Sequence, residues 1–429
     1  MKKTKAFLTI VAAMLFAVSG LFADTVVTFD GLARIRYEYL LNNGDAGNSG
    51  KDEKSYFRFK FSGGVNADFG GFASVYGRLT TESRSYLHNA GGKTEYDINE
   101  AVIDNIYVLF PKLFGAFEVK AGRFDLSGRD YGGGFLIEDG TPLDGSRTFY
   151  FNGAKIAYKG QENSIEFISV YNSAFDAFPV INDKDSRLNS GDEAAAIVYG
   201  RVKANENMYL EPYYIWKQEN KAAAGKIYDE KSQINTFGSY VKYDLKALSL
   251  TAQAAAQIGD YGDEFRSGFG GNVFAGVKIK NIFDPLKIGY TYLSGDDSST
   301  GRQEAWNPLF SRGPQMSEIV ASLYSSESGY GYWTNLQALS VEANASLLKK
   351  LSAKFVYSYM AANETLPEVT GGIFGGGKTR GSLFLCKFVY DISKEMKASL
   401  HGEYFMPGNF YYDGAEDAVF VRAEFSAKI

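Results

Sequence analysis

Cysteine and histidine are scarce in this sequence of 429 residues, which contains one cysteine and two histidines. Because a disulfide needs two thiols, the lone Cys386 excludes an internal disulfide, and a single thiol does not make a metal cluster. We interpret Cys386 as a small apolar residue of a strand. His88 falls in a predicted loop and His401 on a predicted strand, and the sequence predicts neither a cofactor nor a metal.

Long apolar runs are also missing. Beyond the first 23 residues, the longest stretch without Asp, Glu, Lys or Arg is 328–341, which is 14 residues. A membrane-spanning helix needs about 20 apolar residues, so the chain can enter a membrane only as strands. The mean hydropathy of −0.21 is typical of a soluble protein. A barrel in lipid has a similar value, because its apolar residues alternate with polar ones.

The first 23 residues predict a cleaved signal peptide rather than part of the fold. Lysines near the start precede a short apolar run at 6–18, and Ala23 suits the position before a cleavage site. Removal of this segment takes away three lysines and no acid, so the formal charge changes from −5 to −8. An acidic chain gives no reason to expect a nucleic-acid partner. Residues 24–429 contain no obvious linker and are expected to form one domain.

Apolar and polar residues alternate along most of the chain, and the segment 417–429 is typical. Successive side chains of a strand point to opposite faces. One face of this segment therefore carries only Val, Ala, Phe and Ile, while the other is mostly charged. A lysine or arginine facing lipid at mid-depth costs about 2–4 kcal/mol, which keeps charges on one face. In an exported chain, this pattern favours a barrel in lipid, with a large soluble sandwich or β-helix as the alternative.

We predict an all-β fold, a transmembrane antiparallel β-barrel of about 18 strands (16–18), with short periplasmic turns and long extracellular loops. The expected strands lie near 25–40, 54–67, 71–84, 97–110, 115–125, 148–159, 163–172, 191–204, 207–219, 231–244, 247–259, 268–281, 284–295, 333–347, 351–363, 379–391, 395–407 and 417–429. Short connections alternate with long ones, which include 126–147, 260–267 and 296–332. This asymmetry is typical of the bacterial outer membrane. Membrane lipid and the barrel-assembly machinery are the expected partners of such a chain.

Charged residues at inward-facing strand positions are expected to line the bore. The lumen-wall candidates are basic: Arg34, Arg36, Arg58, Lys60, Arg78 and Lys120. Rings of charge set the selectivity of a pore, and arginine binds carboxylates through two parallel hydrogen bonds. Acidic residues occupy inward positions as well, so the same side chains can instead form neutralising pairs that hold neighbouring strands in register.

Two stretches carry more than alternation. Val119–Asp130 ends a strand in Gly-Arg, and Pro142–Ile156 returns through an arginine and Phe-Asn-Gly into the next strand. Gly289–Asp297 ends a strand in Ser-Gly-Asp, and Trp306–Phe310 follows in the next loop. Both stretches resemble the alginate-export family of porin-like outer-membrane β-barrels. The loop residues that carry the second motif are Ser294, Gly295, Asp296 and Pro308.

The resemblance implies a barrel whose arginine-lined lumen binds uronate polymers. The loops 126–147 and 296–332 are long enough to fold inward and narrow the bore. We expect the constriction to combine arginines suggested by the resemblance with nearby acids: Arg123, Arg129, Arg147, Glu118 and Asp139.

The predicted function is passive passage of hydrophilic solutes, such as sugars, oligosaccharides or organic anions, with polysaccharide export included. Two other classes stay open. A non-conducting structural or adhesive barrel would show no channel activity. A hydrolase would need a serine, a base and an acid on neighbouring strands, and only His401 is available as a base on a strand. Asp296 and Asp297 open either a calcium loop or a solvated acidic loop.

Overall fold

The computed structural model describes residues 25–44, 46, 52–88, 97–126, 132–137, 151–175, 191–220, 230–279, 283–311, 316–328, 332–366 and 372–429. The predicted signal peptide lies outside these residues. Within them, no helix is both long enough and apolar enough to cross a membrane.

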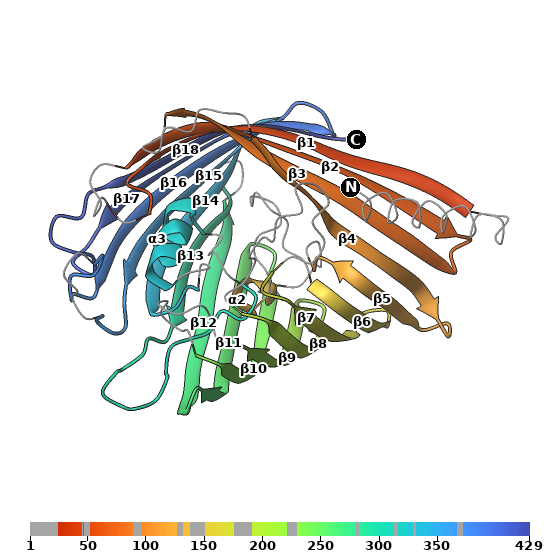
Figure 1. Ribbon diagram of the computed structural model, residues 1–429, viewed down its shortest axis with the longest axis horizontal. Helices are drawn as coiled ribbons and strands as arrows, with labels where there is room; N and C mark the ends of the chain where they lie inside the picture. The colour runs from red at the N-terminus through yellow and green to blue at the C-terminus, as the bar shows by residue number, and fades with distance from the viewer. Residues whose placement is uncertain are drawn as a thin grey trace.

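Eighteen antiparallel strands form one closed sheet, which confirms the predicted barrel (Figure 1). The strands are β1 (Thr25–Leu41), β2 (Glu53–Phe69), β3 (Ala73–His88), β4 (Asp97–Leu113), β5 (Phe117–Phe124), β6 (Phe151–Lys159), β7 (Ser164–Asn172), β8 (Glu193–Asn205), β9 (Met208–Glu219), β10 (Ser232–Asp244), β11 (Leu248–Tyr261), β12 (Glu264–Ile279), β13 (Phe283–Leu293), β14 (Leu336–Leu348), β15 (Leu351–Ala361), β16 (Thr379–Asp391), β17 (Met396–Pro407) and β18 (Ala418–Lys428). Each strand pairs with its neighbours in sequence, and β1 pairs with β18 from Leu32↔Lys428 to Leu41↔Val419. In the described part of the chain, two short helices, α2 (Gly134–Ile137) and α3 (Glu318–Ser328), lie in the long loops.

The alternation of side chains places apolar residues outside and polar residues inside. On β1, Ile35 is 41% exposed whereas its neighbour Arg36 is 1% exposed. On β18, Phe425 is 40% exposed and Arg422 is 2% exposed. Such an apolar outer surface is what a barrel in a membrane presents to lipid. The predicted inside–outside pattern is therefore confirmed on both sides of the seam that closes the barrel.

One connection differs from the prediction. The expected long loop 260–267 is instead a two-residue turn, because β11 and β12 continue as a hairpin to the pair Tyr261↔Glu264. Gly262 supplies the positive φ of 57° that this turn requires. The polar residues here suggested a loop, but several face the lumen, and Arg266 is 2% exposed there. Composition does not distinguish a strand whose polar side chains face a water-filled lumen from a solvated loop, and the sequence therefore predicted a loop here.

The second long loop, which the sequence showed only to be long enough to fold inward, lies inside the barrel. Figure 1 shows α3, drawn in cyan, enclosed by the ring of strands, where it contacts β17 and β18. The sequence pattern predicts a loop at 296–332, so the helix α3 is a difference from that prediction.

Candidate pore constriction

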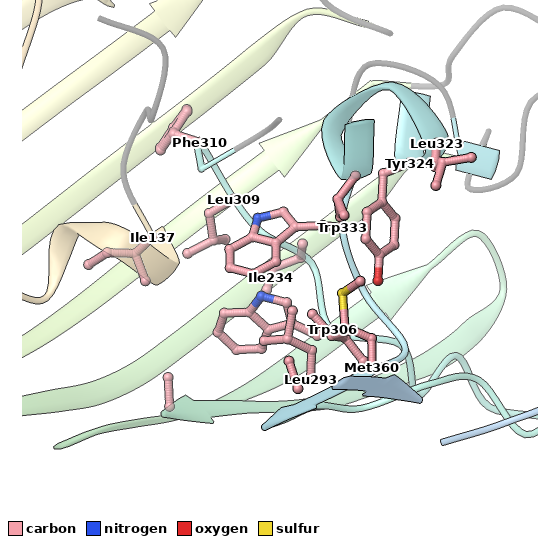
Figure 2. Close-up of a cluster of buried hydrophobic side chains, with 14 of the residues drawn as sticks. Ile137, Ile234, Leu293, Trp306, Leu309, Phe310, Leu323, Tyr324, Trp333 and Met360 are labelled. Carbon is pink, nitrogen blue, oxygen red and sulfur yellow. The ribbon is translucent and has the colours of Figure 1, made fainter. Parts of the chain in front are cut away.

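An apolar cluster inside the barrel joins inward-folded loops to the inner faces of several strands. Trp306 and Trp333 are 1% and 0% exposed, and they pack among Leu293, Tyr324 and Met360 (Figure 2). The cluster joins the loop after β13 to α3 and to the inner wall. Since the lumen of a conducting barrel is wet, burying two tryptophans there fixes the loop against one side of the bore.

A tight turn brings the second motif into this cluster. Asn307 Oδ1 accepts a hydrogen bond of 2.7 Å from the Leu309 amide, and Leu309 has a positive φ of 56°. The Ser311 amide donates to the Pro308 carbonyl at 2.8 Å, which closes the turn. The turn points Leu309 and Phe310 into the apolar cluster, where both are at most 1% exposed. Pro308, named by the family resemblance, is thus part of an anchor for the loop.

Wall residues hold this turn through buried polar contacts. Gln257 on β11 exchanges two hydrogen bonds of 2.8 Å with the backbone of Asn307. Lys217 on β9 is fully buried and donates to the Leu309 carbonyl at 2.7 Å. Its ammonium lies 2.5 Å from Glu219 Oε1 and 3.4 Å from Glu193 Oε1. These partners satisfy a lysine that would otherwise be costly to bury.

The first turn of α3 is capped by the barrel wall. Glu403 on β17 accepts hydrogen bonds from the Ser317 hydroxyl at 2.6 Å, the Glu318 amide at 2.9 Å and the Ile319 amide at 3.0 Å. A carboxylate at a helix N-terminus satisfies free backbone amides and complements the helix dipole. His401 Nε2 lies 3.0 Å from Glu403 Oε1 and is packed against the same wall.

The last turn of α3 is held by a buried ion pair. Glu327 accepts from Arg380 on β16 and from the Tyr411 hydroxyl. Burial raises the pKa of the Glu327 carboxyl, and the adjacent Arg380 guanidinium opposes that rise. Anchors at both ends make α3 a fixed part of the constriction.

Charged side chains cover the inner face of β18, β1, β2 and β3. We call this set the basic wall: Arg34, Arg36, Arg58, Lys60, Arg422, Glu38, Glu82 and Glu424. In the β1–β2 register, Arg34 lies opposite Lys60 and Arg36 lies opposite Arg58. Glu38 joins two strands, with its oxygens 2.7 Å from Arg422 Nε and 2.9 Å from Arg58 Nη1. With five cations and three carboxylates, the basic wall carries a positive excess.

Arg78 and Lys120, the other lumen-wall candidates, occupy neighbouring strands. Arg78 lies 3.0 Å from Asp104 and 3.3 Å from Asp125. The Lys120 ammonium lies 4.4 Å from the centre of the Tyr107 ring. Both extend the charged surface from the basic wall along β3, β4 and β5.

The structure separates the predicted constriction residues that it describes. Arg123 is 3% exposed, with Nε bonded to Asn152 at 2.9 Å and Nη1 bonded to the Ile103 carbonyl at 2.8 Å. Glu118 lies five positions away on β5, about 16 Å along the strand, and pairs with Lys155 at 2.8 Å. Arg129, Asp139 and Arg147 lie outside the described residues.

The Ser294–Gly295–Asp296 motif organises the loop that follows β13. Ser294 Oγ donates to the Glu304 carbonyl at 2.7 Å, and Asp296 accepts from the Glu304 amide at 2.8 Å. Gly295 is required because a Cβ atom there would lie 2.4 Å from Asn335 Oδ1. Hydrogen bonds from Ser299 lower the pKa of Asp297, whereas burial raises that of Asp296.

Calcium at this loop was an open alternative. Asp297 Oδ1 accepts from both the Ser299 amide and its hydroxyl. Nowhere in the described part of the chain do three or more His, Cys, Asp or Glu side chains gather as a metal site.

The role of α3 differs from the loop that the sequence predicts. Ser317 accepts from the Val320 amide at 3.1 Å, and Ile319, Val320, Leu323 and Tyr324 are buried. A serine followed by apolar residues at this spacing is an N-terminal helix signal. The start of the helix could therefore be read from the sequence. The contact between Glu403 and Ser317 could not be predicted, because it joins residues 86 positions apart.

Comparisons with known proteins support this architecture. The family model described as Alginate export matches residues 26–418. No curated protein sequence matches the chain.

Among solved structures, the outer membrane protein opdK from Pseudomonas aeruginosa has a TM-score of 0.60 and 11% identity, with 94% of this chain and 98% of that chain covered. OccK2 (OpdF) from the same organism, in complex with glucuronate, has a TM-score of 0.59 and 12% identity, with 95% and 98% covered. OprD from P. aeruginosa has a TM-score of 0.55 and 10% identity, with 94% of each chain covered. These likenesses show the fold. Since the family model spans nearly the whole barrel, the chain belongs to the Alginate export family, and this membership together with the porin fold supports an outer-membrane channel for hydrophilic solutes.

Proposed function

We propose that this channel passes acidic sugars of the uronate class passively along the basic wall. The observation that carries the proposal is the buried row of Arg34, Arg36, Arg58 and Lys60 on adjacent strands. Guanidinium groups bind carboxylates through paired hydrogen bonds. The family description and a structural neighbour that holds glucuronate support the same class of solute. The sugar hydroxyls would be solvated by water in the rest of the bore.

The test is ion selectivity together with solute uptake. The triple variant Arg34→Gln, Arg58→Gln, Lys60→Gln removes three positive charges from the basic wall. We expect its reversal potential in a KCl gradient to shift toward cations, and glucuronate uptake into proteoliposomes to fall. The control is Lys287→Gln with Lys354→Gln, which removes two cations that pair with Glu342 on another part of the wall, and the effects are compared per charge removed. Equal effects in both variants, or no change in either, would overturn the proposal.

Several further assignments accompany this proposal. Residues 1–23 would be removed on export, and 24–429 would form one domain inserted by the barrel-assembly machinery. Membrane lipid would cover the outer face. The chain would act as a channel and not as an enzyme, since His401 is 6% exposed and faces the anchor of α3. The predicted roles of Arg129, Arg147 and Asp139 in the constriction stay predictions.

The filled part of the lumen favours a second candidate, a non-conducting structural barrel. The apolar cluster around Trp306 and Trp333 occupies space that an open pore would leave to water. Recording from purified, folded protein in planar bilayers separates the two functions. Discrete current steps support the channel, and their absence at all voltages would favour the structural role.

A further inference from the structure

One acidic side chain of α3 reaches the basic wall. The Glu318 carboxylate lies 2.9 Å from Arg422 Nη1, while Arg422 Nε lies 2.7 Å from Glu38 on β1. Arg422 therefore connects the constriction helix to the basic wall. Glu318 reduces the positive excess of the wall at the point where α3 meets it.

The backbone of α3 stays in place at this contact. Glu403 holds the first turn through the Ser317 hydroxyl and two backbone amides, and none of these bonds involves the Glu318 side chain. The Glu318 side chain is 32% exposed, whereas that of Arg422 is 3% exposed. A partly exposed ion pair contributes little free energy. The Glu318 carboxylate can therefore leave Arg422 by rotation about side-chain bonds, without movement of the helix.

The Arg422 guanidinium has donors left for another carboxylate. Its Nη2 atom is buried and has no hydrogen-bond partner in the described residues, and Nη1 faces Glu318 without a well-aligned hydrogen bond. Carboxylates bind guanidinium groups best through two parallel bonds, a geometry that Glu318 does not achieve here. His401 lies directly across from Arg422 in the β17–β18 register.

We propose that Glu318 is a tethered competitor that occupies a carboxylate site on Arg422 and sets the selectivity of the channel. A solute carboxylate enters by displacing the Glu318 side chain and forming the two-bond contact. Solutes without a carboxylate cannot displace the Glu318 side chain, so they pass without binding to Arg422. This inference rests on the proposed function, since it assumes that the solute is a carboxylate.

The test uses full-length folded protein in planar bilayers, with sodium glucuronate as the probe of current block. In Glu318→Gln the competitor is neutral, so we expect glucuronate to bind roughly twofold to fivefold more tightly, the factor that a partly exposed ion pair corresponds to. Block by glucose is expected not to change. The matched control is Glu342→Gln, which removes one wall carboxylate that pairs with Lys287 and Lys354. If glucuronate affinity rises equally in Glu318→Gln and Glu342→Gln, the cause is the net charge of the lumen and not the contact with Arg422. That result would overturn the inference.

A double-variant cycle tests the contact itself. In an Arg422→Gln background, Glu318→Gln is expected to add no further tightening, because the shared site is gone. An undiminished gain in that background would overturn the inference. If the wild type binds glucuronate and the triple variant of the basic wall weakens it, but Glu318→Gln has no effect, only the competitor role fails. If glucuronate blocks none of the variants, the proposed function fails as well.

Discussion

Arg380 on β16 and Glu327 on α3 form an ion pair inside the barrel, with Arg380 Nη1 2.9 Å from each carboxylate oxygen of Glu327. Both side chains are at most 5% exposed. The guanidinium also lies over Phe410, 3.9 Å from the ring centre. The Tyr411 hydroxyl donates to the same carboxylate at 3.2 Å. The pair thus fixes the C-terminal turn of the constriction helix to the wall.

Glu327→Gln is expected to release this end of α3. The change leaves the Arg380 charge buried without its partner, and loss of one member of such a pair costs about 3–5 kcal/mol. We expect a larger and noisier single-channel current, together with a lower temperature for the gel-mobility shift of the folded barrel. The control is Glu364→Gln, because Glu364 pairs with Lys378 at the surface and its loss should cost under about 1 kcal/mol.

A second variant makes this prediction specific to the pair. Replacing both partners, as in Glu327→Gln with Arg380→Gln, removes the unpaired charge. The double variant should therefore be more stable than Glu327→Gln alone. If it is instead less stable by the full sum of the two single changes, the ion pair does not hold α3 in the way we describe.

Gly270→Ala is expected to disturb the packing of Trp306. A Cβ atom at Gly270 would lie 2.7 Å from Cδ2 of that indole, closer than carbon atoms approach in folded proteins. The ring must move away from β12, so we expect a red shift of tryptophan emission and an increased conductance. Gly77→Ala is the matched control, since a Cβ atom on that β3 residue would have nothing within 4 Å. Identical spectra for both variants would contradict the packing described for the loop.

The barrel was predictable because its rule is local. Lipid on one side and water on the other penalise any residue on the wrong face, so neighbours such as Ile35 and Arg36 reveal the inside and the outside. Each alternating segment between two turns counts as one strand, and counting these segments gave the number of strands. The same rule failed near Gly262, where polar residues belong to β11 and β12, which continue as a hairpin up to a two-residue turn.

The constriction was not predictable, because its contacts are not local. Arg380 and Glu403 could be assigned to the inner face, but no pattern indicates that they meet the two ends of α3, 53 and 86 positions away in the sequence. Arg123 was assigned to the constriction from a family-like motif, and that assignment stays a prediction. The motif did not indicate that its guanidinium bonds Asn152 and the Ile103 carbonyl. Alternation assigns a face, and only three-dimensional packing assigns a partner.

Ile288→Arg is expected to destabilise the barrel by about 2–4 kcal/mol, the cost of a guanidinium facing lipid at mid-depth. Ile288 lies on β13 and is 54% exposed on the outer face. The adjacent Lys287 faces inward and lies 3.2 Å from Glu342. Lys287→Arg introduces the same side chain one position away and should cost little. Urea titration of the folded protein in lipid vesicles measures both, and a similar loss in the two variants would contradict the assigned faces.

The last prediction concerns Cys386, the only thiol in the chain. In the register of β15, β16 and β17, Cys386 lies between Phe355 and Gly402, and Phe355 is 42% exposed on the outer face. The thiol should therefore face hydrocarbon. We expect a charged, membrane-impermeant methanethiosulfonate reagent to leave it unmodified in proteoliposomes, while an apolar maleimide that partitions into lipid labels it.

Moving the thiol by one residue should reverse this reactivity, because adjacent side chains of a strand face opposite sides. In the variant Cys386→Ser with Lys387→Cys, the thiol lies on the inner face, where water and the charged reagent have access through the bore. Mass spectrometry after a timed exposure gives the labelled fraction of each protein. Modification of the native thiol by the charged reagent at the rate of the shifted one would mean that β16 does not separate lipid from water as the barrel requires.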